Sequence, residues 1–323
     1  MMPNHSVFVF LFLLNLVCCK EIDIRQVDLE LDRVPVSPEL FAGHIVSTAL
    51  YERDIAISTE GDMVIYTLGN YKQTRRCLVM IRKVEANWSE PEIVTLSGKH
   101  QDIEPFITPD GSRLYFASNR PIDGDTSRAD YNIWFSDRVG DNWSNPVALD
   151  TLINTRGDEF YPSVSEDGDL YFTATREEGF GLEDIFHSTF VNGEFQKPVA
   201  LDSTINSSRY EFNAYISPDE ALIIFSSYGR QDGFGGGDLY YSTRNENGSW
   251  NKSINMGPAV NSAKLDYCPF VDWPRHNFYF TSERAAANRQ PITSIDDLIL
   301  ESNSILNGYG NIYRVGFKYL ALE

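Results

Sequence analysis

Short runs of alternating apolar and polar residues return along the chain, separated by turns rich in Pro, Asp and Gly. In residues 107–118 the end of one run is followed by a Pro-Asp-Gly turn and by the aromatic run Leu-Tyr-Phe. The same arrangement recurs at residues 164–174, 216–227 and 271–282, and more weakly at 57–66. Such alternation of β-branched and aromatic residues is typical of half-buried strands.

An acidic residue precedes each of these units, at intervals of 50 to 57 residues. The five acids are Glu52, Asp102, Glu159, Glu211 and Asp266. A period of this size with several short strands per unit indicates a repeat architecture. The pattern predicts an all-β fold, a five-bladed β-propeller of four-stranded antiparallel blades.

The second unit shows the four strands, which we term a to d from the axis outward. They are expected at residues 104–108, 113–117, 132–136 and 146–149. An aromatic residue then recurs near the end of four units and is expected to pack between blades: Trp88, Trp143, Phe195 and Trp250.

The fifth unit has only three such strands, at residues 267–271, 277–281 and 311–315. Residues near 36–46 resemble the end of a d strand, so we expect them to complete this blade and remove an open sheet edge. The prediction is one propeller domain over residues 36–323. Its blades lie near 51–96, 102–150, 159–202, 211–257 and 266–319, the last with 36–46.

The repeat resembles the TolB-like propeller family of bacterial envelope proteins, a Pro-Asp variant of WD-type repeats. The residues that carry the resemblance are Ser217-Pro218-Asp219, Pro109-Asp110-Gly111, the Leu-Tyr-Phe runs and the strands that begin at Asp184 and Asp238. The resemblance covers residues 36–319 and implies a periplasmic or surface-exposed interaction module. TolB itself has six blades and an added N-terminal domain, and this sequence shows neither.

The first nineteen residues contain no Lys, Arg, Asp or Glu, and residues 7–17 are almost wholly apolar. This run fits the core of a signal peptide and is too short to span a bilayer. Residues 16–19, Leu-Val-Cys-Cys, resemble a bacterial lipobox, although Cys18 stands where a small residue is usual. We therefore expect an exported protein of the periplasm or outer membrane, lipid-anchored at Cys19, with residues 20–35 as a linker.

The 323-residue chain has 27 basic and 46 acidic residues and a formal charge of −19. This balance disfavours nucleic acid and anionic membranes, because phosphate binding needs clustered Lys and Arg. Membrane contact is expected only through the N-terminal lipid. Cys77 and Cys268 fall on a third and a first strand, so we expect no bridge and two small buried apolar residues.

The five acids fall at the channel mouth, on the face formed by the b–c loops and d–a crossings. There they would either concentrate cations such as Ca²⁺ or accept structural hydrogen bonds. Arg156, Arg209 and Lys264, which precede three of the acids, favour the structural interpretation.

Other loops add two candidates. Asp123, Asp125 and Asp130 loosely resemble a calcium loop without its spacing, so we expect no cofactor, with Ca²⁺ at this loop as the alternative. Residues 285–308 form a long b–c insertion in which Ser294 is expected to cap a helix with Asp297 in its first turn. The insertion is either a binding loop or lid, or an amphipathic helix that plugs the channel or packs on the blade.

The sequence contains no nucleophile elbow, zinc-protease helix or phosphate-binding loop, and so gives no positive sign of an enzyme. Our first hypothesis is a non-catalytic, lipid-anchored envelope propeller that binds a protein partner on the b–c/d–a face. The alternative is a carbohydrate-binding or glycoside-cleaving propeller that uses the acidic channel mouth. Its candidate carboxylates are Asp102, Glu159 and Glu211.

Overall fold

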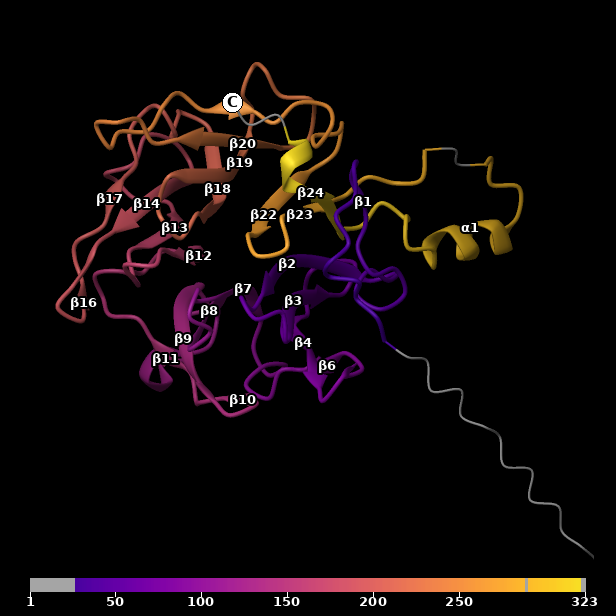
Figure 1. Ribbon diagram of the computed structural model, residues 1–323, viewed down its shortest axis with the longest axis horizontal. Coiled ribbons are helices and arrows are strands. Elements are labelled where there is room, and N and C mark those ends of the chain that lie inside the picture. Colours follow the sequence, from indigo (N-terminus) through magenta and orange to yellow (C-terminus); the bar gives the residue numbers. More distant parts are fainter. Residues whose placement is uncertain (1–26, 288–289, 321–323) are drawn as a thin grey trace, which may run out of the picture.

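The computed structural model describes residues 27–287 and 290–320, which form five blades of antiparallel β-sheet around a common axis (Figure 1). The innermost strands contact one another in a closed ring. In ring order these are β2 (Tyr51–Ile57), β7 (Asp102–Ile107), β12 (Glu159–Val164), β18 (Tyr210–Ile216) and β22 (Asp266–Asp272). The five-bladed propeller predicted from the sequence is confirmed.

Each blade continues outward by antiparallel pairing. The first blade adds β3 (Met63–Gly69), β4 (Arg76–Val84), β5 (Asn87–Trp88) and β6 (Glu92–Ile93). The second adds β8 (Arg113–Ser118), β9 (Asn132–Val139), β10 (Asn142–Trp143) and β11 (Val147–Ala148). The third adds β13 (Leu170–Ala174), β14 (Asp184–Ser188), the hairpin β15 (Phe190–Val191) and β16 (Glu194–Phe195), and β17 (Val199–Ala200). The fourth adds β19 (Leu222–Tyr228), β20 (Asp238–Thr243) and β21 (Ile254–Asn255).

The fifth blade joins the two ends of the described chain. It contains β22, β23 (Asn277–Ser282), β24 (Asn311–Gly316) and, as its outermost strand, β1 (Glu39–Leu40). Glu39 lies opposite Arg314 in the ladder, and the N–H of Phe41 donates to the carbonyl of Ile312 at 2.9 Å. The N-terminal segment therefore completes the last blade, as its resemblance to a d strand predicted.

Apolar side chains on both faces of the blades fill the space between neighbouring sheets. Three of the four recurring aromatics, Trp143, Phe195 and Trp250, are buried, whereas Trp88 is half-buried. Burial of one such side chain stabilises the fold by about 1.5–3 kcal/mol. The even recurrence of these rings thus reflects packing between blades.

The insertion in the last b–c loop contains the one α-helix of the described residues, α1 (Ile295–Ser302). Ser294 and Asp297 form the expected capping box. No residue of α1 is buried, and the helix lies outside the ring (Figure 1). Of the two alternatives, plugging or packing is not seen for α1, whose Ile295, Leu298, Ile299 and Leu300 are at least half exposed, whereas Leu306 at the end of the insertion packs against the core. The short helices η1 (Ile122–Gly124) and η2 (Phe317–Tyr319) lie in connections, and none of the described helices is long and apolar enough to cross a membrane.

Candidate functional site

The five repeat acids are fully buried, so they do not line an open channel mouth. Each accepts a hydrogen bond from a Ser or Thr hydroxyl four or five residues earlier in the d–a crossing. Glu211 is representative, since it accepts from the N–H of Ser207 at 2.7 Å and from the hydroxyls of Ser207 and Ser227 at 2.8 Å. These bonds fix the crossing from one blade to the next.

Four of the acids also form an ion pair with an Arg just beyond strand b of their own blade. The pairs are Asp102–Arg120, Glu159–Arg176, Glu211–Arg230 and Asp266–Arg284. Each guanidinium also lies over aromatic rings of its blade, as Arg230 does at 4.6 Å from the Tyr240 ring centroid. The sequence pointed to Arg156, Arg209 and Lys264 instead, and the structure pairs none of these with the acids among the described residues.

Glu52 differs from the other four acids, because no Arg of the described residues pairs with it. Burial raises the pKa of Glu52 to about 7, although hydrogen bonds from Thr48 oppose the rise. In the other four blades, the residues at the end of strand b are followed closely by the Arg that pairs with the acid. In the first blade strand b ends at Leu68-Gly69, and no Arg follows at this place. Glu52 is therefore a repeat acid whose buried charge has hydrogen bonds but no Arg partner among the described residues.

A second ring of residues, which we term the bulge residues, lies two positions after the acids. The bulge residues are Asp54, Glu104, Tyr161, Asn213 and Cys268, with φ of 55°, 60°, 50°, 51° and 54°. In all five inner strands the pairing register shifts at this point, as a β-bulge requires. A left-handed backbone is unusual for residues other than Gly, so its fivefold recurrence is a built feature of the propeller axis.

Strand b of the preceding blade accepts hydrogen bonds from three bulge N–H groups. Thr67 accepts from Glu104, Thr173 from Asn213 and Thr281 from Asp54, at 3.0, 3.1 and 3.3 Å. The second blade has Ala117 at this place and offers no hydroxyl. There the carboxylate of Glu104 accepts the N–H of Tyr161 instead, at 2.7 Å. The Glu104 carboxylate on the axis thus takes the place of the hydroxyl that Ala117 lacks.

Arg53 connects the polar bulge residues into one cluster. Its guanidinium donates to Asp54 at 2.7 and 2.9 Å and to Glu104 at 2.8 Å, and it lies 5.0 Å from the Tyr267 ring centroid. Only 14% of the Arg53 side chain is exposed. Since a buried charge needs a partner, the cluster depends on this single cation for two carboxylates.

Burial disfavours the charged forms of two other members of the cluster, Glu104 and Cys268. Burial raises the pKa of Glu104 to about 7, with Arg53 opposing the rise and Asp54 adding to it. Burial, followed by the Asp54 charge, raises the pKa of the Cys268 thiol well above its usual range, and the thiol donates to Asp54. Cys268 therefore belongs to a polar cluster, which corrects its interpretation as an apolar residue. Cys77 is half-buried and, as predicted, neither cysteine forms a bridge.

A pocket of about 250 Å³ lies over this cluster at the starts of the inner strands, and we term it the loop-side pocket. Its walls include the residues that directly follow the acids. They are Arg53, Ile103, Phe160, Phe212 and Tyr267, joined by Arg76, Thr173, Glu183 and Leu265, with Glu104 and Asn213 below. Three aromatic rings thus stand above a polar floor, on the face where the sequence placed binding.

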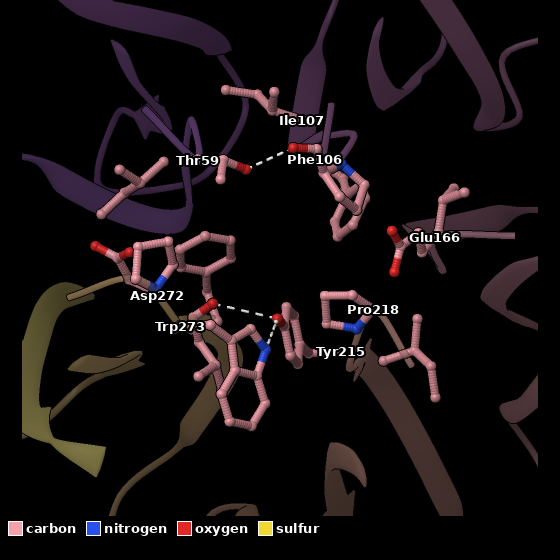
Figure 2. Close-up of a pocket in the computed structure, with 15 residues that line it drawn as sticks. Thr59, Phe106, Ile107, Glu166, Tyr215, Pro218, Asp272 and Trp273 are labelled. Carbon is pink, nitrogen blue, oxygen red and sulfur yellow. Dashed lines mark hydrogen bonds between the residues drawn. The ribbon is translucent and has the colours of Figure 1, made fainter. Parts of the chain in front are cut away.

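The opposite end of the axis holds a different pocket, of about 330 Å³, which we term the turn-side pocket. It is surrounded by the a–b turns, and its walls are mostly apolar (Figure 2). Trp273 donates from Nε1 to the Tyr215 hydroxyl at 2.9 Å, and Tyr215 donates to the carbonyl of Val271 at 3.2 Å. No residue pattern predicted a pocket at this end of the axis.

The structure does not bring Asp123, Asp125 and Asp130 together as metal ligands. Asp125 accepts from Ser127, whereas Asp130 forms an ion pair with Arg128 and accepts from Asn132. In residues 27–287 and 290–320 the one group of three with ligand atoms close enough for a metal is elsewhere. Asp125 and Asp130 thus already have protein partners, and the three carboxylates form no preformed ligand cluster in the described structure.

No family model matches the chain, and no curated protein does either. Among solved structures, it is similar to the α-L-arabinofuranosidase PaAbf62A from Podospora anserina, at 11% identity and a TM-score of 0.48 over 87% of this chain and 97% of that one. It is similar to the GH43 endo-arabinanase from Bacillus licheniformis, at 12% identity and a TM-score of 0.48 over 82% and 93%. A puromycin-hydrolyzing peptidase of Mycobacterium tuberculosis matches at 11% identity and a TM-score of 0.41, over 81% of this chain and only 42% of that one. At these values the likeness concerns overall fold and identifies neither family nor activity.

Proposed function

We propose that this propeller binds a small neutral carbohydrate in the loop-side pocket without cleaving it. The observation that carries the proposal is the composition of the propeller axis at this end. The aromatic rings of Phe160, Phe212 and Tyr267 surround a floor that holds Glu104 and Asn213. A sugar ring combines apolar C–H faces with hydroxyl groups, so apolar walls with a few placed polar groups suit it.

The size and the charges of the pocket limit the class of ligand that it can bind. A volume of about 250 Å³ is below the roughly 300–1,000 Å³ of sites for drug-sized ligands, which favours one sugar ring over a chain. Glu183 supplies a wall carboxylate that forms no ion pair among the described residues, and burial raises its pKa. Its oxygens are available to accept hydrogen bonds from ligand hydroxyls.

We expect binding without cleavage because the carboxylates near the axis are buried or already hydrogen-bonded. A glycosidase needs one carboxyl group to protonate the leaving oxygen and a second that acts as base or nucleophile. Asp102, Glu159 and Glu211 are fully buried, and Asp54 and Glu104 already accept hydrogen bonds on both oxygens. None of these five groups is free to reach a glycosidic bond.

Calorimetric titration with a panel of neutral pentoses and hexoses tests the proposal. Phe212→Ala and Glu183→Ala should each weaken binding by tenfold or more, because each removes a wall contact worth about 1.5–3 kcal/mol. Trp273→Ala in the turn-side pocket is the matched control and should leave the affinity unchanged. Equal binding by all three variants, or no binding by any sugar of the panel, would contradict it, and release of reducing sugar from an aryl glycoside would contradict the non-catalytic part.

A second candidate function is docking of a protein partner through the insertion, favoured by the exposure of α1. Ile295 and Leu300 are 78% and 75% exposed, and Leu298 and Ile299 are about half exposed. A cluster of exposed apolar side chains on one short helix is typical of an interaction site. Capture with a variant carrying Ser at these four positions should lose any partner that wild type retains.

A further inference from the structure

We propose that Asp169, His187 and Glu220 form a binding site for a zinc-class divalent ion at the junction of the third and fourth blades. Asp169 directly precedes β13, His187 lies on β14, and Glu220 lies in the turn between β18 and β19. One ligand atom from each residue falls within 4.8 Å of the others. The three residues belong to two blades and lie apart from both axial pockets.

The donor set selects the class of ion. An imidazole nitrogen with carboxylate oxygens suits zinc and similar first-row ions, whereas Ca²⁺ and Mg²⁺ prefer oxygen ligands alone. His187 Nε2 lies 3.1 Å from Asp169 Oδ2. That is close to the ~3.3 Å between two ligands of a tetrahedral site with bonds of ~2.0–2.1 Å. An ion would need to draw the Glu220 oxygen inward by about 1–2 Å, which a turn side chain can provide.

In both Asp169 and Glu220, one carboxylate oxygen has a protein partner outside the site. The second oxygen is left for an ion. Asp169 Oδ1 accepts from the N–H of Phe190 at 2.8 Å, which leaves Oδ2 toward His187. Glu220 Oε2 pairs with Arg244 at 2.7 Å, and Oε1 is buried. Outer partners that orient ligands in this way are characteristic of metal sites.

The placement of Glu220 beside the Asp169–His187 pair, with three possible ligand atoms within 4.8 Å of one another, is the observation that points to a ligand. A buried carboxylate oxygen costs free energy unless it is paired, and a cation would supply a further interaction. The Tyr171 hydroxyl, which accepts from Arg244 at 2.7 Å, is also a hydrogen-bonding neighbour of Glu220. Burial, followed by the Glu220 charge, raises the pKa of Tyr171, so this hydroxyl keeps its proton and remains a neutral neighbour.

The rest of the surroundings allow an ion. The His187 ring stacks on Tyr171 with centroids 4.6 Å apart, which fixes the direction of Nε2. Arg244 balances one of the two carboxylate charges, so the three side chains and Arg244 together carry one net negative charge before the ion binds. All three ligands are half-buried, which leaves the site open to solvent for the remaining coordination positions. An ion there would hold the third blade to the fourth.

Titration of the EDTA-treated protein with Zn²⁺ tests this site. We expect one tight site per chain, weakened at least tenfold in His187→Gln and in Glu220→Gln. His100→Gln, outside the cluster, should bind as wild type. Unchanged affinity in the two cluster variants, or equal competition by Ca²⁺, would overturn the proposal.

A measurement on the wild-type protein keeps the test decisive if a variant fails to fold. X-ray absorption of the Zn²⁺-loaded protein should show one imidazole ligand and oxygen ligands. A spectrum with no imidazole, or one with several, would assign the bound zinc to adventitious surface groups and overturn the site. Because sugar binding and zinc binding use separate residues, failure of either one leaves the other unaffected.

Discussion

Arg53 from the first blade and Glu104 from the second form a 2.8 Å ion pair beside the propeller axis, under the loop-side pocket. The same guanidinium also neutralises Asp54 at 2.7 Å. Glu104 in turn accepts the N–H of Tyr161 from the third blade. This relationship links the inner strands of three consecutive blades through side chains and sets the polarity of the pocket floor.

Replacement of Arg53 should therefore destabilise the whole ring. Arg53→Met leaves two buried carboxylates without a cation, and we expect a loss of about 3–5 kcal/mol in the free energy of unfolding. Arg75→Met, at an exposed position nearby, should change it by less than about 0.5 kcal/mol. Urea unfolding measures the free energy of unfolding of both variants. Equal values would show that the Arg53 ion pairs do not stabilise the ring.

Glu52 predicts how stability depends on pH. Its pKa is about 7 in the folded protein and near 4.5 ordinarily, so the folded state binds the extra proton between these values. Stability from this group is present below about pH 4.5 and is lost as pH rises through 7, by at most about 3 kcal/mol. Glu104, also near 7, adds to the same fall. Glu52→Gln should lose stability less steeply than wild type between pH 5 and 8, and parallel profiles would contradict this assignment.

Replacement of Glu211 by Gln should destabilise the fold much more than replacement of Glu52 by Gln. Glu211→Gln removes the charge that balances Arg230, a side chain only 15% exposed. An uncompensated buried cation should cost about 3 kcal/mol at neutral pH, whereas Glu52→Gln at pH 8 should cost little. Thermal unfolding of the two variants side by side decides the matter. Similar losses would mean that the Arg pairs add nothing to the hydrogen bonds of the crossings.

The expected anchor at Cys19 lies outside the described residues and stays a prediction. Expression in a Gram-negative host with labelled palmitate should give a labelled protein in the membrane fraction. Cys19→Ser should abolish both the label and membrane retention, while Cys18→Ser should keep them. Label that survives in Cys19→Ser would contradict lipidation at this position.

The repeat allowed the fold to be predicted from the sequence. In each unit apolar and polar residues alternate with a period of two, and the same type of turn follows. Strand b of the second blade was expected at residues 113–117 and is observed at Arg113–Ser118. Closure by the N-terminal strand was readable too, since residues 36–46 match other d strands and β1 pairs with β24. Even the cap of α1 at Ser294 followed from local chemistry.

The candidate site was less readable, for physical reasons. The bulge residues Asp54, Glu104, Tyr161, Asn213 and Cys268 share a backbone conformation and no chemical type, so no residue pattern marked them. The Arg partners of the acids could have been found, because Arg120, Arg176 and Arg284 each stand two residues after a strand-b end. The metal cluster joins two blades through Glu220, which lies 33 residues beyond His187, and no local motif connects them.

The most direct test of the central claim is a crystal structure of the protein with the tightest-binding sugar of the panel. The account predicts density for one sugar ring in the loop-side pocket, against Phe160 and Phe212 and within hydrogen-bond distance of Glu183. Density in the turn-side pocket beside Trp273, or only at the surface, would contradict the claim that the Arg53–Glu104 end of the axis is the binding site.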